Sequence, residues 1–285
     1  MVERIHDPAE LRARCDAERA AGRRVGFVPT MGALHEGHTS LMEEAKARGA
    51  DFRVVSVFAN PLQFAPDEDL DRYPRTLDAD CARCEEKGVD LVYAPSARAM
   101  YPEGFQTHVE VNGLTEPLEG SFRPTHFRGV TTVVTKLFGA VGPCVAVFGR
   151  KDYQQWRVLD RMTRDLNLPV EGVGAPIIRE ADGLALSSRN RYLDEAERPR
   201  ALGIVQGLRS AFDAYQGGER DPDALIARVR SEVESRFDRI DYVACVNPDT
   251  LQPDPTCEGP ALLVAAHLGK TRLIDNLQLG QDPRP

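Results

Sequence analysis

The chain has 285 residues, of which 42% are hydrophobic and 28% are charged, and its formal net charge is -8. This length allows two domains, and the composition is that of an ordinary globular protein. The acidic balance argues against nucleic-acid binding, which needs a basic face. The N-terminal stretch carries acids without an apolar core, and no run approaches the ~18 apolar residues of a membrane helix. We therefore expect neither a signal peptide nor a membrane span.

Six cysteines are scattered along the chain, which favours a reducing cytoplasm over a disulfide framework. Cys81 and Cys84 form a lone CxxC in a helical stretch, and no second pair at zinc-ribbon spacing accompanies it. Two incidental helix cysteines explain this pattern better than a zinc site does.

The first part of the chain alternates between strand-like and helix-like segments. Apolar runs predict strands at 24–29, 52–58, 90–95, 107–111 and 144–149. Helical spacing and capping residues predict helices at about 8–22, 38–49, 76–88, 126–141 and 152–167. The strands are continuously apolar, which is typical of a parallel sheet covered on both faces. We therefore expect a Rossmann-like α/β domain, with its ligand crevice at the carboxyl ends of the strands.

The character of the chain changes after about residue 178. Two long helical segments are expected at 194–216 and 222–236, followed by the strand-like runs IDYVACV, ALLVAAHL and TRLID. The last two runs are joined by Gly269-Lys270, a hairpin signal. We therefore expect a nucleotide-binding domain over 1–178 and a smaller α+β lid domain with an antiparallel sheet over 179–285.

The stretch VPTMGALHEGHTSLMEEAK places His35 and His38 around Gly37, where a predicted strand gives way to a helix. A helix start after a glycine-bearing turn presents main-chain N–H groups that can bind phosphate. The histidine spacing is i, i+3 rather than the i, i+4 of zinc proteases, so a nucleotide site is the better interpretation. The alternative is a surface helix start with two solvated histidines.

Two further segments carry phosphate-binding groups. GRKDYQQ places Lys151 at a helix start, and LSSRN presents Ser187, Ser188 and Arg189 in a loop. A lysine is a point charge for phosphate, and a forked guanidinium suits a clamp on pyrophosphate. The alternatives are a solvated lysine and a polar turn.

A third segment, FANPLQF, places Asn60 and Gln63 just past a strand. Neutral amides can hold hydroxyls and a carboxylate without attacking them. The alternative is that Asn60 caps a turn and that Gln63 is solvated.

Together these segments resemble the pantothenate synthetase family, the pantoate–β-alanine ligases of the HxGH nucleotidyltransferase superfamily. The similar segments are VPTMGALHEGH, FANPLQF, DLDRYPRTLDAD, RPTHFRGV, GRKDYQQ and DGLALSSRNRYLD, and the similarity returns at LLVAAHLGKTRLIDN. The resemblance implies that pantoate attacks ATP to form a pantoyl-adenylate and pyrophosphate. The amine of β-alanine then displaces AMP to give pantothenate.

The resemblance also implies residue roles. ATP would contact Pro29, Thr30, Met31, Gly32, Ala33, Leu34, His35, Glu36, Gly37, His38, Gly149, Arg150, Lys151, Asp152, Ile178, Leu186, Ser187, Ser188 and Arg189. The catalytic donors would be His35, His38, Lys151, Ser187, Ser188 and Arg189, with His38 as the proton donor. Pantoate would contact Asn60, Gln63 and Gln155, and Gln63 would also touch β-alanine.

Mg²⁺ is expected at the phosphates, with Asp80 as its candidate protein contact, directly or through water. Ala79 and Arg83 beside it are not oxygen ligands. The family further implies a cytoplasmic homodimer. Two departures stand out: Arg150 replaces a usual Glu, and Trp156 stands where an aliphatic residue is common.

Two other functions stay open from the sequence. A nucleotidyltransferase of the same superfamily, acting on a phosphorylated substrate, would need extra basic residues. A non-catalytic nucleotide sensor would be expected to lose one of the donors, and none is missing.

Overall fold

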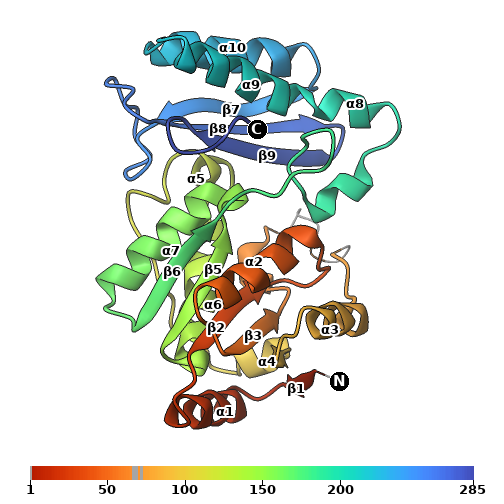
Figure 1. The fold of residues 1–285 in the computed structure, drawn as a ribbon, viewed down its shortest axis with the longest axis vertical. Helices are drawn as coiled ribbons and strands as arrows, with labels where there is room; N and C mark the ends of the chain where they lie inside the picture. The colour runs from red at the N-terminus through yellow and green to blue at the C-terminus, as the bar shows by residue number, and fades with distance from the viewer. Residues whose placement is uncertain (1, 66–69, 71–72) are drawn as a thin grey trace. The chain divides into compact units, whose positions relative to one another are not determined.

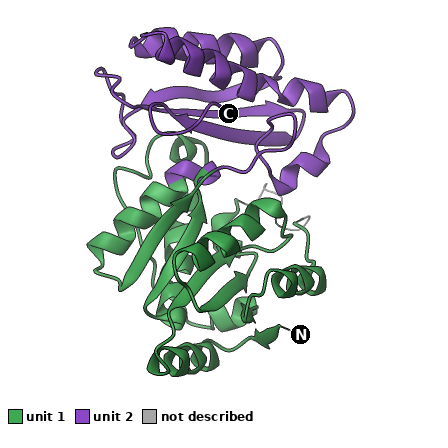
Figure 2. Cartoon of the chain, viewed as in Figure 1, with its two compact units in different colours: residues 1–150, 155–176 green, residues 151–154, 177–285 purple. Residues whose placement is uncertain are grey.

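The computed structural model describes residues 2–65, 70 and 73–285, so the start of the DLDRYPRTLDAD motif lies partly outside the described residues. The chain forms two compact units. The first comprises residues 1–150 and 155–176, and the second comprises 151–154 and 177–285 (Figure 2). The domain boundary predicted at 178/179, and the lid role of the second domain, stay predictions.

A six-stranded parallel sheet forms the centre of the first unit, in the order β1-β4-β3-β2-β5-β6 (Figure 1). Each adjacent pair of strands is parallel. The strands are β1 (Glu3–Ile5), β2 (Val25–Thr30), β3 (Phe52–Val57), β4 (Leu91–Tyr93), β5 (Cys144–Gly149) and β6 (Val170–Ala175).

Both faces of this sheet are buried. Because side chains alternate along a strand, neighbouring residues of β2 enter different cores. Phe27 packs in a cluster with side chains of α1 (Pro8–Ala20) and α6 (His126–Val141). Val28 packs in a second cluster with side chains of α2 (Glu36–Ala47) and α3 (Leu77–Glu86). The continuous apolar strands of the sequence follow from this double burial.

The connections after β2 and β3 emerge at the same sheet edge, since the two strands are parallel neighbours. The first leads into α2, and the second leads into the short helix η1 (Pro61–Gln63). The other helical segments of this part of the chain are α4 (Ala97–Met100), α5 (Glu119–Phe122), η3 (Arg150–Asp152) and α7 (Tyr153–Asp165).

The second unit has an antiparallel sheet in the order β7-β8-β9. Its strands are β7 (Arg239–Val246), β8 (Ala261–Leu268) and β9 (Thr271–Gln278), and Leu268 pairs with Thr271 around the expected hairpin. Side chains of α9 (Gly203–Gln216) and α10 (Pro222–Glu234) share one apolar cluster with the sheet. The two remaining helices are η4 (Ser188–Tyr192) and α8 (Glu197–Ala201). The predicted fold class, a parallel-sheet α/β domain followed by an antiparallel α+β domain, is confirmed.

Several local predictions were wrong. Residues 107–111 form no strand, because the main-chain groups of Val109 bond to hydroxyls of α6 instead: its N–H to Thr132 Oγ1 and its carbonyl to Thr131 Oγ1. The predicted helix 194–216 is divided into α8 and α9. Gly203, a weak helix former, begins α9 and packs closely against the carbonyl of Glu232.

Helices long and apolar enough to cross a membrane are not found within the described residues. The six cysteines are buried free thiols. Burial raises the pKa of the Cys84 thiol to about 12, so this cysteine packs in the core as an inert group.

Candidate active site

The two motif histidines lie close together where the connection from β2 ends and α2 begins. His35 is the N-cap of α2, and its imidazole lies 4.1 Å from that of His38, centroid to centroid. The Nδ1 of His38 accepts from the main-chain N–H of His35 at 3.2 Å, and the Nδ1 of His35 accepts from that of Gly37 at 3.1 Å. A main-chain N–H can only donate, so both Nδ1 atoms carry lone pairs. In its neutral form each ring then carries its proton on Nε2 and can donate it to phosphate oxygen.

Several main-chain amides around this connection are already bonded within the protein. Gly32 donates to Thr30 Oγ1, whereas Ala33 and Leu34 donate to the carboxylate of Asp80. The N–H groups of residues 35 and 37 reach the imidazoles, as described above. The N–H groups of residues 32–35 and 37 are therefore committed in this geometry, and the imidazoles are the better phosphate donors.

Asp80 is 2% exposed and lies on α3. Its Oδ1 accepts from Leu34 N–H at 2.8 Å, and its Oδ2 accepts from Ala33 N–H and the Thr76 hydroxyl, both at 3.1 Å. Both oxygens are thus engaged by protein donors, which does not fit the predicted direct contact with Mg²⁺. Among the described residues, no group of three or more His, Cys, Asp or Glu side chains is placed to hold a metal ion.

Asn60 and Gln63 meet on η1. Asn60 is 1% exposed and caps η1, and its Nδ2 donates to Gln63 Oε1 at 3.0 Å and to the Gly129 carbonyl at 3.1 Å. Its Oδ1 accepts from the Tyr101 hydroxyl at 2.7 Å. Burial raises the pKa of Tyr101, which keeps that hydroxyl protonated as a donor. Asn60 therefore orients Gln63, whose own Nε2 reaches Met31 Sδ at 3.1 Å.

The start of α6 holds the main chain of Gln63, a contact that no residue pattern in the sequence had indicated. The carbonyl of Gln63 accepts from His126 Nδ1 at 3.0 Å and lies 3.4 Å from Arg123 Nη2. Because a carbonyl only accepts, His126 carries a proton on Nδ1. Gly129 permits the close approach: a Cβ there would lie 2.6 Å from the Gln63 nitrogen and closer still to the Leu62 carbonyl. The RPTHFRGV motif thus positions Gln63.

The remaining candidate donors belong to the second unit. The Lys151 carbonyl accepts from Asn276 Nδ2 of β9 at 2.8 Å, and Lys151 Nζ lies 4.0 Å from a carboxylate oxygen of Asp152. Ser187 is the N-cap of η4, where its hydroxyl accepts from Arg189 N–H at 3.2 Å. Sequence reasoning assigned Lys151 to the first domain, because it did not foresee the bond to Asn276, 125 residues away.

The loop before Ser187 is fixed within the second unit. Leu186 N–H donates to the Ile178 carbonyl at 2.9 Å, so these two predicted ATP contacts are neighbours. Arg179 forms a two-bond ion pair with Asp275 of β9, at 2.6 and 3.0 Å. Because Asp275 is 4% exposed, this pair is shielded from water and anchors the loop firmly.

Comparison with known families decides the identity of the chain. The family model described as Pantoate-beta-alanine ligase matches residues 3–278. The chain belongs to the pantoate-beta-alanine ligase family. It is an enzyme with pantoate–β-alanine ligase activity, which sets aside the nucleotidyltransferase and sensor alternatives.

Relatives resemble this ligase over nearly its whole length. The pantothenate synthetase of Syntrophotalea carbinolica is 52% identical over 274 residues, covering 95% of this chain and 96% of that protein. Pantothenate synthetase 1 of Bradyrhizobium diazoefficiens is 52% identical over 277 residues, covering 96% of this chain and 97% of that protein.

Solved structures share the fold. A crystal structure of pantothenate synthetase from Thermus thermophilus matches with a TM-score of 0.91 and 47% identity, covering 97% of this chain and 99% of that one. The pantoate-beta-alanine ligase of Francisella tularensis, complexed with beta-gamma ATP and beta-alanine, matches with a TM-score of 0.81 and 30% identity. That match covers 98% of each chain.

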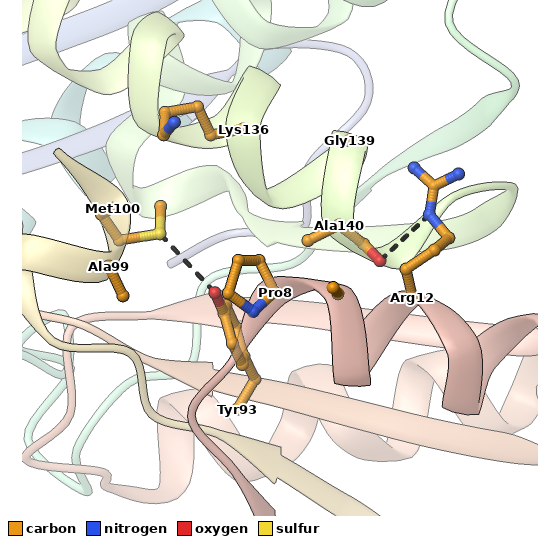
Figure 3. Close-up of a pocket in the computed structure, with 9 residues that line it drawn as sticks. Pro8, Arg12, Tyr93, Ala99, Met100, Lys136, Gly139 and Ala140 are labelled. Atoms are coloured by element: carbon orange, nitrogen blue, oxygen red, sulfur yellow. Dashed lines mark hydrogen bonds between the residues drawn. The ribbon is translucent and has the colours of Figure 1, made fainter. Parts of the chain in front are cut away.

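A cavity of about 300 Å³ in the ligase lies apart from the predicted site residues. It is bounded by α1, α4, α6 and the end of β4, and Figure 3 shows Arg12 and Lys136 among its lining side chains. The hydroxyl of Tyr93 lies 3.7 Å from Met100 Sδ. Burial raises the pKa of Tyr93 to about 12. None of the predicted site residues lines this cavity.

Proposed function

We propose that the chain condenses (R)-pantoate with β-alanine at the expense of ATP, through a pantoyl-adenylate. A pantoate carboxylate oxygen attacks the α-phosphorus of ATP, the bond to the β-phosphate oxygen breaks, and pyrophosphate leaves. The amine of β-alanine then attacks the acyl carbon, the bond to the AMP oxygen breaks, and the amine releases its proton to solvent. A carboxylate is a poor electrophile, so the carboxyl group of pantoate must first acquire AMP as a leaving group.

The observation that carries the proposal is the paired orientation of His35 and His38. Each Nδ1 accepts a main-chain hydrogen bond, so the proton of each neutral ring sits on Nε2. Two oriented donors suit a reaction that concentrates negative charge on phosphate oxygens. Such a site works by positioning and neutralising rather than by forming a covalent bond with the protein.

The other roles follow from the chemistry of the side chains. Lys151, Ser187, Ser188 and Arg189 would neutralise the phosphates. Gln63 and Gln155 would hold pantoate, and Gln63 would also touch the incoming β-alanine. Asn60, which is buried and bonded to Gln63, would act on pantoate through that neighbour. ATP would be used as its Mg²⁺ complex, with the metal on phosphate oxygens and water.

Within this proposal the nucleotide contacts are the two stretches 29–38 and 149–152, together with Ile178 and 186–189. We also propose a homodimer in the cytoplasm. The six buried free thiols suit a reducing compartment. Light scattering on the purified chain at micromolar concentration measures the oligomeric state, and a monomer mass would exclude the dimer.

The test is to incubate the chain with ATP, Mg²⁺, β-alanine and pantoate labelled with ¹⁸O in its carboxylate. Mass spectrometry should find pantothenate, pyrophosphate and AMP, with one ¹⁸O transferred to AMP. A mechanism through an acyl phosphate would instead produce ADP and labelled inorganic phosphate.

A further inference from the structure

The loop between β2 and α2 adopts a conformation that few residues accept. Gly32 has φ +86° and Ala33 has φ +52°, which is in the left-handed region. An alanine in this region is strained, so neighbouring contacts must hold it there. Thr30 fixes the start of the loop, since its hydroxyl donates to the Ser56 carbonyl at 2.7 Å and accepts from Gly32 N–H.

Asp80 supplies contacts at the centre of the loop. Its carboxylate accepts from the N–H groups of Ala33 and Leu34, which lie 47 and 46 positions earlier in the chain. The Thr76 hydroxyl donates to the same carboxylate from the start of α3. The loop backbone also lies tight against it, because a Cβ on Gly32 would come within 3.0 Å of Asp80 Oδ2.

We infer that Asp80 is a positioning residue that locks the loop before His35, and so aims the two imidazoles, rather than a ligand of the metal that accompanies ATP. His35 follows Leu34 directly, so the bond from Leu34 N–H to Asp80 fixes the Ala33–Leu34 peptide, one residue before His35. His35 in turn donates its main-chain N–H to His38. A shift of the loop would therefore misdirect both donors together.

The burial of Asp80 separates this role from metal binding. At 2% exposure, with three protein donors on its two oxygens, the carboxylate has no side open to a hydrated cation. Mg²⁺ gives up its waters reluctantly and needs an accessible oxygen. The YPRTLDAD segment therefore positions the loop before His35. This role needs no oxygen ligands at the neighbouring positions, which are Ala79 and Arg83.

This inference rests on the proposed function, because its kinetic test uses the adenylation of pantoate. The decisive variant is Asp80→Asn, which keeps the size of the side chain but turns one acceptor into a donor that faces main-chain N–H groups. The milder variant is Thr76→Val, which removes one donor to Asp80 and keeps the shape. The matched control is Asp78→Asn on the same helix, because the Asp78 side chain is 93% exposed and pairs with Arg4 at the surface.

We expect kcat to fall about 10²-fold in Asp80→Asn, as misplacement of reacting groups by about 1 Å can cause. The fall in kcat should be smaller in Thr76→Val, and the kcat of Asp78→Asn should equal that of the parent. The Mg²⁺ concentration that gives half the maximal rate should be unchanged in all three variants. A half-maximal Mg²⁺ concentration raised several-fold in Asp80→Asn, with activity restored by excess Mg²⁺, would overturn the inference and make Asp80 a metal ligand.

Hydrogen exchange tests the inference independently of any activity. The amides of Ala33 and Leu34 should exchange faster in Asp80→Asn and in Thr76→Val, while the amides of β2 stay protected. If Asp80→Asn does not fold, Thr76→Val decides the matter: parental exchange at both amides together with parental kcat would overturn the inference. An inactive parent chain with slow exchange at these amides would instead count against the proposed function alone.

Discussion

The Nδ1 atom of His38 accepts a hydrogen bond from the main-chain N–H of His35, 3.2 Å away. This contact gives His38 two separable tasks. Its Nδ1 caps the start of α2, and its Nε2 is the proposed phosphate donor.

The two tasks can be separated by substitution. His38→Asn keeps an acceptor near the Nδ1 position but loses the Nε2 donor, so the fold should survive while kcat falls roughly 10²–10³-fold. His38→Gln places an amide N–H near the Nε2 position and should recover part of that loss. Steady-state kinetics with thermal unfolding measures both effects. Equal, near-parental turnover in the two variants would return His38 to a purely structural cap.

Gly129 gives a test of how α6 holds Gln63. In Gly129→Ala the new Cβ would collide with the 62–63 peptide, so we expect a loss of ~1–3 kcal/mol in the free energy of unfolding and a raised KM for pantoate. The control is Gly139→Ala in the same helix, where a Cβ meets nothing within 4 Å. That control should gain ~0.5–1 kcal/mol. A parental KM for pantoate in Gly129→Ala would show that the contact of α6 with Gln63 does not affect pantoate binding.

Gln63 and Lys151 should affect different substrates. Gln63→Ala removes an amide proposed to meet pantoate, so adenylation should be lost while the Kd for ATP stays unchanged. Lys151→Ala removes a charge proposed to meet phosphate, so the Kd for ATP should rise. Calorimetric titration with a non-hydrolysable ATP analogue separates the two. An equal loss of nucleotide affinity in both variants would show that Gln63 contributes to ATP binding.

Substitution of Arg189 tests the phosphate-binding role of the segment around η4, whose N-cap is Ser187. A forked guanidinium can bind two phosphate oxygens at once, which an ammonium cannot, so Arg189→Lys should slow adenylation far more than it weakens pantoate binding. ATP should also protect the backbone of residues 183–190 from hydrogen exchange, as expected of a loop that orders on phosphate. Exchange rates unchanged at saturating ATP and Mg²⁺ would leave the loop as a polar turn.

Sequence patterns predicted the parallel sheet because β2, β3 and β5 are buried on both faces and are therefore largely apolar rather than alternating. They missed β6, where Gly172 and Gly174 interrupt the apolar pattern of an edge strand, and β1, which is only 3 residues long. Residues 107–111 have strand-like alternation, but their partner is the hydroxyl-bearing face of α6, which no local pattern reveals.

For the candidate site, too, some features could be predicted from the sequence and others could not. The motif residues could be picked out because histidine, lysine and arginine side chains have recognisable chemistry. The contacts that aim them could not be predicted, because they join distant segments: Asp80 to the loop before His35, His126 to Gln63, and Asn276 to Lys151. Residue spacing carries no information about which side chain bonds to which distant main-chain group.

In the proposed reaction, pantoate is activated before β-alanine takes part. This order can be measured as the exchange of labelled pyrophosphate into ATP, in the presence of Mg²⁺ and pantoate and without β-alanine. Reversible formation of the pantoyl-adenylate predicts exchange under these conditions, and predicts its loss when pantoate is omitted. Exchange that strictly requires β-alanine would contradict the adenylate mechanism and favour a single concerted step.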